Sequence, residues 1–244
     1  MRRIKSYRIW EKEGNLTSVQ IDFLNRYVTG SWTMNPEGLV DVEGDFDCSS
    51  KKIVSLNGIR FGSVGGNFYC SYNQLTSLEG APEKVGGNFY CPYNQLTSLE
   101  GAPEKVDGDF HCNKNQLISL KGAPEKVGWN FYCSYNQLTS LEGAPREVSG
   151  DFYCMDNQLI SLEGATRDVD GNYYFSDNPV SVETLNKIIS YIIDNPEMGY
   201  GAILASLQSR ISQEDWEKLD KSSLDKMNQT RKKVYGMLGG IGGI

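Results

Sequence analysis

The feature that most constrains this chain is a sequence period of 21 residues. The stretch GGNFYCSYNQLTSLEGAPEKV, residues 65–85, is followed directly by GGNFYCPYNQLTSLEGAPEKV, residues 86–106, and the two differ only at Ser71 and Pro92. The six cysteines mark the same period, because their spacings are 22, 21, 21, 21 and 21 residues: Cys48, Cys70, Cys91, Cys112, Cys133 and Cys154. Such regular spacing indicates a structural repeat rather than a set of disulfide bridges.

The repeat unit reads Val-x-Gly-(Asn/Asp)-Phe-x-Cys-x-x-Asn-x-Leu-x-x-Leu, followed in most copies by Gly-Ala-Pro. Seven copies begin at Val42, Val64, Val85, Val106, Val127, Val148 and Val169. The first copy is degenerate, with Lys51 in place of the asparagine, and the last has Phe175 in place of the cysteine. One unit is too short to bury a core alone, so stacked units are expected to share a continuous one.

Within each unit, the alternation in Asn88–Cys91 predicts a short strand with Phe89 and Cys91 inward and Tyr90 outward. Leu96, Leu99 and Val106 are expected to bring the chain back around the same core. A buried asparagine needs hydrogen-bond partners, and its amide can bond the loop backbone of its own and neighbouring turns. This asparagine ladder is predicted at Asn73, Asn94, Asn115, Asn136, Asn157 and Asn178.

The pattern Phe-x-Cys-x-x-Asn-x-Leu-Thr-Ser-Leu resembles the leucine-rich repeat in its short bacterial form. The sequence GNFYCSYNQLTSLEGAPEKV, with the flanking segments FLNRYVTGSW and SDNPVSVETLNKI, looks like repeat proteins encoded by tailed bacteriophages. The resemblance implies an α+β repeat solenoid: a leucine-rich-repeat-like right-handed coil with a short-stranded parallel β-sheet and helical caps at both ends. The resemblance also implies that the protein binds other proteins, and it implies no defined biochemical activity.

Both ends of the repeat array are expected to be capped. Residues 1–41 are predicted as an N-terminal helical cap, with a helix over 16–28 whose capping box is Thr17 and Gln20. Residues 42–178 hold the seven repeats, and 179–235 form a C-terminal helical cap. Its first helix follows Ser181, ends at Asp194-Asn195-Pro196 and has one apolar face: Val182, Leu185, Ile188, Ile189 and Ile192. Further helices are expected over 198–210, from Ser212 and over 224–235, before a flexible Gly-rich tail, 236–244.

Composition excludes several classes of protein. A formal net charge of −7 and a pI near 4.9 argue against a general nucleic-acid binder. No apolar run reaches the roughly 18 residues of a membrane span. The N-terminus has no apolar segment typical of a secretory signal. The predicted location is therefore cytoplasmic, in the bacterial host cytoplasm if the protein is phage-encoded.

No catalytic, metal or cofactor motif is found. The single histidine, His111, falls on an outward strand position, where a surface or contact role is more typical than catalysis. The cysteine column lacks the paired CxxC spacing of zinc ligands, and cysteine suits a small inward apolar position. Phosphate-binding loops of the GxxxxGK(S/T) type are absent. We therefore expect no enzyme, no metal and no cofactor.

The outward face of the sheet is the predicted functional surface. Its tyrosines can stabilise neighbouring strands, bind a partner, or do both. The copies in the middle depart most from the repeat, with Trp129 where others have glycine. The predicted partner-binding residues are Tyr69, Tyr90, Asp109, His111, Asn113, Trp129, Tyr132, Tyr153 and Met155.

The sequence thus predicts a non-catalytic protein-binding leucine-rich repeat module. It is expected to be phage-encoded and to act on a bacterial host protein through a concave sheet face, as a host-takeover or anti-defence inhibitor. A virion or assembly component is the alternative, and small-ligand sequestration is a more remote one. The pattern leaves the oligomeric state open.

Overall fold

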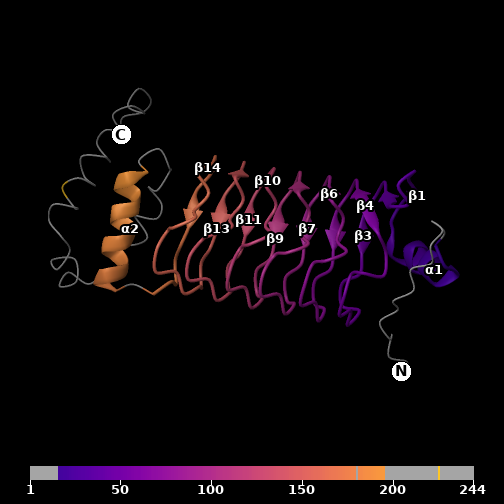
Figure 1. Cartoon of the computed structure of the whole chain (residues 1–244), viewed down its shortest axis with the longest axis horizontal. Coiled ribbons are helices and arrows are strands. Elements are labelled where there is room, and N and C mark those ends of the chain that lie inside the picture. Colours follow the sequence, from indigo (N-terminus) through magenta and orange to yellow (C-terminus); the bar gives the residue numbers. More distant parts are fainter. Residues whose placement is uncertain (1–15, 180, 196–224, 226–244) are drawn as a thin grey trace, which may run out of the picture.

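The chain forms a β-solenoid with turns of about 21 residues and one helix at each end. The computed structural model describes residues 16–179, 181–195 and 225. In Figure 1 the turns follow one another in a single row, with α1 (Ser18–Tyr27) at one end and α2 (Val182–Asp194) at the other. The repeat and the helical ends predicted from the sequence are therefore confirmed.

One wall of the solenoid is a seven-stranded parallel sheet, with one short strand from each repeat. Pairing is in register, so that Phe89 lies beside Phe68 and Phe110, and Tyr90 lies beside Tyr69 and His111. Its strands are β3 (Phe46–Asp47), β5 (Phe68–Tyr69), β7 (Phe89–Tyr90), β9 (Phe110–His111), β11 (Phe131–Tyr132), β13 (Phe152–Tyr153) and β15 (Tyr173–Tyr174).

A second, eight-stranded sheet forms the opposite wall, and the sequence analysis did not predict it. Its strands are β1 (Trp32–Met34), β2 (Val40–Val42), β4 (Phe61–Val64), β6 (Lys84–Val85), β8 (Lys105–Val106), β10 (Lys126–Val127), β12 (Glu147–Val148) and β14 (Asp168–Val169). Only β1 is antiparallel to its neighbour. Most of these strands are two residues long, which is too short for an alternating pattern to reveal them.

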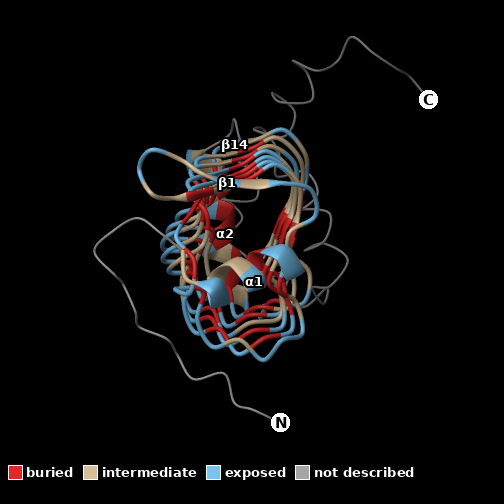
Figure 2. Cartoon of the chain, turned by 90° about the vertical axis from the view of Figure 1, so that its right-hand side faces the viewer, coloured by how far each residue is buried: buried red, intermediate tan, exposed pale blue. Residues whose placement is uncertain are grey.

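Figure 2 looks along the stack and shows the buried residues gathered inside the two walls. The phenylalanines stack turn upon turn, with ring centroids 5.2 Å apart for Phe68 and Phe89 and 5.1 Å apart for Phe89 and Phe110. The leucine pair of each turn, such as Leu96 and Leu99, is fully buried beside them. Repetition of one apolar set per turn therefore builds a single continuous core.

The predicted asparagine ladder is confirmed. In the turn of Asn94, the side-chain amide donates to Cys91 O and to Cys70 O of the preceding turn, each over 3.0 Å. Its Oδ1 accepts from Leu75 N, also over 3.0 Å. One side chain therefore satisfies backbone groups of two turns, which is why every unit after the first has an asparagine at this position.

The predicted ends are confirmed where the structure describes them. Thr17 and Gln20 form the capping box of α1. In α2, Ser181 is the N-cap, and four of the five residues predicted for its apolar face are buried, Val182 being partly so. The N-terminal cap also contains β1, so it is not wholly helical. The helices expected over 198–210, from Ser212 and over 224–235, and the tail 236–244, lie outside the described residues, apart from Asp225.

No helix in the described part of the chain is long and apolar enough to cross a membrane.

Candidate functional site

The exposed side of the seven-stranded sheet carries a column of side chains that, after its first member, are stacked aromatic rings. Its members, here called the central column, occupy the outward position of each strand: Asp47, Tyr69, Tyr90, His111, Tyr132, Tyr153 and Tyr174. Ring centroids are 5.0 Å apart for Tyr69 and Tyr90, and 4.5 Å apart for Tyr132 and Tyr153. The rings lie nearly parallel, with interplanar angles of 9° in both pairs. All the predicted tyrosines therefore lie on one surface.

Stacking leaves these rings half-buried, because each ring face is covered by the ring of the next turn. The ring edges and hydroxyl groups remain for a partner. Tyr153 Oη donates to Asp151 Oδ2 over 3.0 Å. Burial, followed by this hydrogen bond and the Asp151 charge, raises the pKa of Tyr153. The central column therefore presents neutral hydroxyl groups rather than open aromatic faces.

His111 completes this column instead of interrupting it. Its ring stacks 4.3 Å from Tyr90 and 4.2 Å from Tyr132. Only 20 % of its side chain is exposed, so it is less accessible than an outward position suggested. Nε2 lies 3.7 Å from Asp109 Oδ2 and makes no hydrogen bond. Burial lowers the pKa of His111 below 6.5, although Asp109 acts in the opposite direction.

Beside the central column runs a second hydrogen-bonded ladder, here called the Asx column: Asp45, Asn67, Asn88, Asp109, Asn130, Asp151 and Asn172. In every turn but the last, Oδ1 accepts from the backbone N–H of the same position one turn later. Examples are Asp109 N to Asn88 Oδ1 at 2.6 Å and Asn130 N to Asp109 Oδ1 at 2.8 Å. The predicted contact residue Asp109 therefore also has a structural role. Asparagine and aspartate serve that role equally, because both provide Oδ1.

On the other side of the central column lie Ser49, Ser71, Pro92, Asn113, Ser134, Met155 and Ser176. The side chains of this column are less accessible than predicted for outward positions, since Ser71 and Ser134 are buried. The predicted contact residues Asn113 and Met155 are half-buried. They lie two turns apart on the same face as the tyrosines, and neither side chain is fully exposed there.

Trp129 is the most exposed of the predicted residues, with 66 % of its surface accessible. It lies at the corner between β10 and β11, in a column that otherwise contains only glycine: Gly44, Gly66, Gly87, Gly108, Gly150 and Gly171. A Cβ built on Gly87 would lie 2.7 Å from Asn67 Oδ1 and 2.8 Å from Gly66 O. The fold therefore favours glycine at this corner.

The turn of Trp129 is slightly more widely spaced than the others. The N–H of Trp129 donates to Gly108 O over 3.2 Å, whereas the equivalent bonds of the other turns measure 2.8 to 3.1 Å. The neighbouring phenylalanine pair, Phe110 and Phe131, is also the most widely spaced of the stack, at 5.4 Å. Nothing in the described packing requires a tryptophan at this corner.

The sequence analysis missed a further column, here called the corner column: Ser50, Tyr72, Tyr93, Lys114, Tyr135, Asp156 and Asp177. All seven have positive φ, between 52° and 60°. Tyr72 and Tyr93 stack at 4.3 Å, and Lys114 Nζ lies 4.9 and 5.1 Å from the ring centroids of Tyr93 and Tyr135. The recurrence of tyrosine with the 21-residue period is the sequence feature that could have predicted this column.

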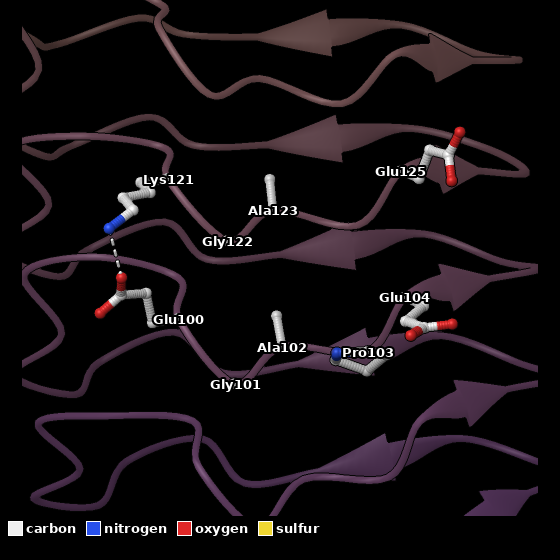
Figure 3. A pocket seen from close by; sticks show the side chains of 9 residues that line it. All are labelled: Glu100, Gly101, Ala102, Pro103, Glu104, Lys121, Gly122, Ala123 and Glu125. Carbon is white, nitrogen blue, oxygen red and sulfur yellow. Dashed lines mark ion pairs between the residues drawn. The ribbon is translucent and has the colours of Figure 1, made fainter.

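Elsewhere, the repeated Gly-Ala-Pro leaves a shallow hollow of ≈ 520 Å³ between two turns (Figure 3). Its floor is formed by small residues such as Ala102 and Ala123. Glu100 and Lys121 form an ion pair of 2.7 Å on one side, and Glu104 and Glu125 lie on the other. The hollow is open and holds no convergent set of buried polar groups, so it lacks the features of a small-molecule site.

The cysteines belong to the core, as predicted. All six are free and buried, and the thiols of Cys91 and Cys112 donate to carbonyl groups of the next turn. Burial raises their pKa values, that of Cys48 to about 12. Within the described ranges, no group of three or more His, Cys, Asp or Glu is arranged to hold a metal ion.

Comparison with family models, curated proteins and solved structures finds no match for this chain.

Proposed function

We propose that this protein is a non-catalytic binding module that recognises another protein through the face of its seven-stranded sheet. The observation that carries the proposal is Trp129. An exposed indole stands at a corner where the fold favours glycine. Tryptophan and tyrosine are enriched among the residues that dominate binding energy at protein interfaces.

The surroundings of Trp129 support a protein partner. Seven strands spaced about 4.8 Å apart make a face about 29 Å wide, which is enough for a helix or an extended segment. Tyrosines of the central and corner columns add apolar area and hydroxyl groups to the same turns of the solenoid, as at many interfaces. The thiols on this wall are buried and protonated, so they offer no nucleophile to a substrate on the face.

The finer assignments rest on the sequence pattern and belong to the same proposal. They are a leucine-rich-repeat-type module, a phage origin, and a bacterial host protein as the partner, met in the host cytoplasm and inhibited for takeover or anti-defence. A right-handed coil is also proposed, because parallel strands of one sheet are nearly always joined by right-handed crossovers.

The proposal is tested by affinity purification of the tagged protein from bacterial lysates, with and without phage infection. Trp129→Gly removes the indole and restores the residue of the other turns, so the fold is expected to be retained. The matched control, Ile118→Thr with Ile160→Thr, also restores residues of other turns and removes exposed apolar side chains away from this face.

We expect one protein to co-purify with the parent and the control variant and to be lost with Trp129→Gly. Recovery of the same proteins with all three forms, or of none under either condition, would contradict the proposal. Circular dichroism spectra of the three forms establish that loss of binding does not reflect loss of the fold.

A further inference from the structure

The face around Trp129 differs in charge from the rest of the protein. The central, Asx and corner columns, with the column of Asn113 and Met155, hold six aspartates and one lysine, and neither glutamate nor arginine. Among the residues that the structure describes, the rest of the protein holds 11 Lys/Arg and 18 Asp/Glu, so it is acidic as well. The opposite wall mixes both signs, with ion pairs such as Arg146 to Glu125 and Lys126 to Glu147. This face differs in having a single cation for its six carboxylates.

The fold does not require this charge. In the Asx column, Asp109 Oδ1 accepts from Asn130 N, and Asp151 Oδ1 accepts from Asn172 N, each over 2.8 Å. Asn88 and Asn130 provide the same contact in other turns, at 2.6 and 2.7 Å. A neutral amide therefore suffices at each step of the ladder. The second carboxylate oxygen adds charge that the ladder does not use; that of Asp151 also accepts from Tyr153 Oη over 3.0 Å.

These two carboxylates lie on either side of Trp129. The next residue, Asn130, is the neutral member of the Asx column between Asp109 and Asp151, so one carboxylate lies one turn before it and the other one turn after. The turns are about 4.8 Å apart. Among the aromatic residues of this part of the face, Trp129 is not stacked on a neighbouring ring in the way the tyrosines are, and it is the most exposed.

We propose that Trp129, Asp109 and Asp151 form a site for an arginine or lysine side chain of a basic segment of the partner protein. This inference rests on the proposed function and specifies its partner. An indole attracts a cation through its ring face, and carboxylates form charge-assisted hydrogen bonds with guanidinium and ammonium groups. The remaining aspartates of the face disfavour an acidic segment in the same position.

The test is a titration of the full-length, ¹⁵N-labelled protein with octa-arginine, octa-lysine and octa-glutamate peptides at low salt. The indole N–H resonance of Trp129, assigned by its absence in Trp129→Gly, reports binding at the site. The double variant Asp109→Asn with Asp151→Asn keeps the Oδ1 ladder. An Asn88–Tyr90 contact already shows that asparagine fits beside a tyrosine hydroxyl. The control, Glu83→Gln with Glu104→Gln, makes the same change in net charge near the opposite wall.

We expect the basic peptides to shift the Trp129 resonance and octa-glutamate to leave it unchanged. The double aspartate variant should bind roughly tenfold or more weakly, in keeping with the strength of charge-assisted hydrogen bonds, while the glutamate control should bind like the parent. Added salt should weaken binding to the parent.

Three results would overturn the inference: no shift with either basic peptide, equal affinity for the parent and the double aspartate variant, or equal weakening in both double variants. If the peptides fail while a protein is still captured through Trp129, the binding function stands and the cationic partner is wrong. If the peptides bind as expected while no protein is captured, the site recognises cations and the proposed cellular partner is wrong.

Discussion

Each turn of the solenoid after the first contains one asparagine whose side chain completes the backbone hydrogen bonding of two turns. Asn115 donates to Cys91 O and Cys112 O over 3.1 Å each, and its Oδ1 accepts from Leu96 N over the same distance. The corner where these groups meet is enclosed by the chain, so water is a poor substitute for the amide. A residue of similar size without an amide would leave Leu96 N unpaired, whereas each of the two carbonyls would keep a second donor, the ladder asparagine of a neighbouring turn.

Replacing Asn115 with leucine is therefore expected to lower the free energy of unfolding by about 1–3 kcal/mol, the cost of one unsatisfied buried group. Urea denaturation followed by circular dichroism measures the loss. Gln116→Leu, at the exposed neighbouring position, should change the free energy by less than about 0.5 kcal/mol. Equal midpoints for the two variants would refute the role assigned to this asparagine.

At the scale of elements, the helix α2 covers the last turn of the repeat array. Its buried residues Leu185, Ile188, Ile189 and Ile192 belong to the same core cluster as Tyr173 and Phe175 of the final turn. A solenoid without such a cover exposes an apolar cross-section and the edges of both sheets. The cap therefore determines whether the stack ends or associates with another copy.

Ile188→Asp places a charge in this cap and should detach α2, with a loss of more than about 3 kcal/mol from the cap. The exposed end should then bind an apolar fluorescent dye and promote self-association, which light scattering detects. Ser190→Asp adds the same charge at an exposed position of α2 and should leave the protein monodisperse to the same degree as the parent. If Ile188→Asp behaves like Ser190→Asp, α2 is not the cover that its burial indicates.

At the scale of the whole molecule, each turn contacts mainly its two neighbours, so the number of turns is adjustable. Residues 86–106 form one complete unit, and their removal joins Val85 to Asp107, the junction already present after Val106. Every stacked column then keeps its register, with one member fewer.

The protein lacking residues 86–106 is expected to fold, with somewhat lower stability and a length reduced by about 4.8 Å. Circular dichroism and small-angle X-ray scattering measure the two effects. Deletion of residues 86–95, less than half a turn, should unfold the array because apolar positions would face solvent. Equal damage from both deletions would show that the turns are not interchangeable units.

The 21-residue period was sufficient to predict the stack, its inward Phe and Cys columns and the asparagine ladder, because these features are local and repeat in nearly every unit. The first helix of each cap was predicted from its N-cap residues and its helical periodicity. The tyrosine column follows from the alternation of the strands, because successive side chains of a strand point to opposite sides. Trp129 was selected because it departs from the glycine of the other turns.

Only the tertiary structure revealed the second wall, the corner column and the use of the Asx column as a ladder. The second wall consists mostly of two-residue strands, which form only because the strands of neighbouring turns pair with them. The corner tyrosines lie in a left-handed backbone conformation that no alternation pattern reveals. Contacts between turns also decided which residues are accessible: they left His111 half-buried between tyrosine rings and gave Asp109 a backbone partner, while Trp129 stayed exposed. The sequence by itself determined what repeats along this protein, because that depends on neighbours in the chain. The tertiary structure decided what is left over for a partner, because that depends on neighbours one turn away.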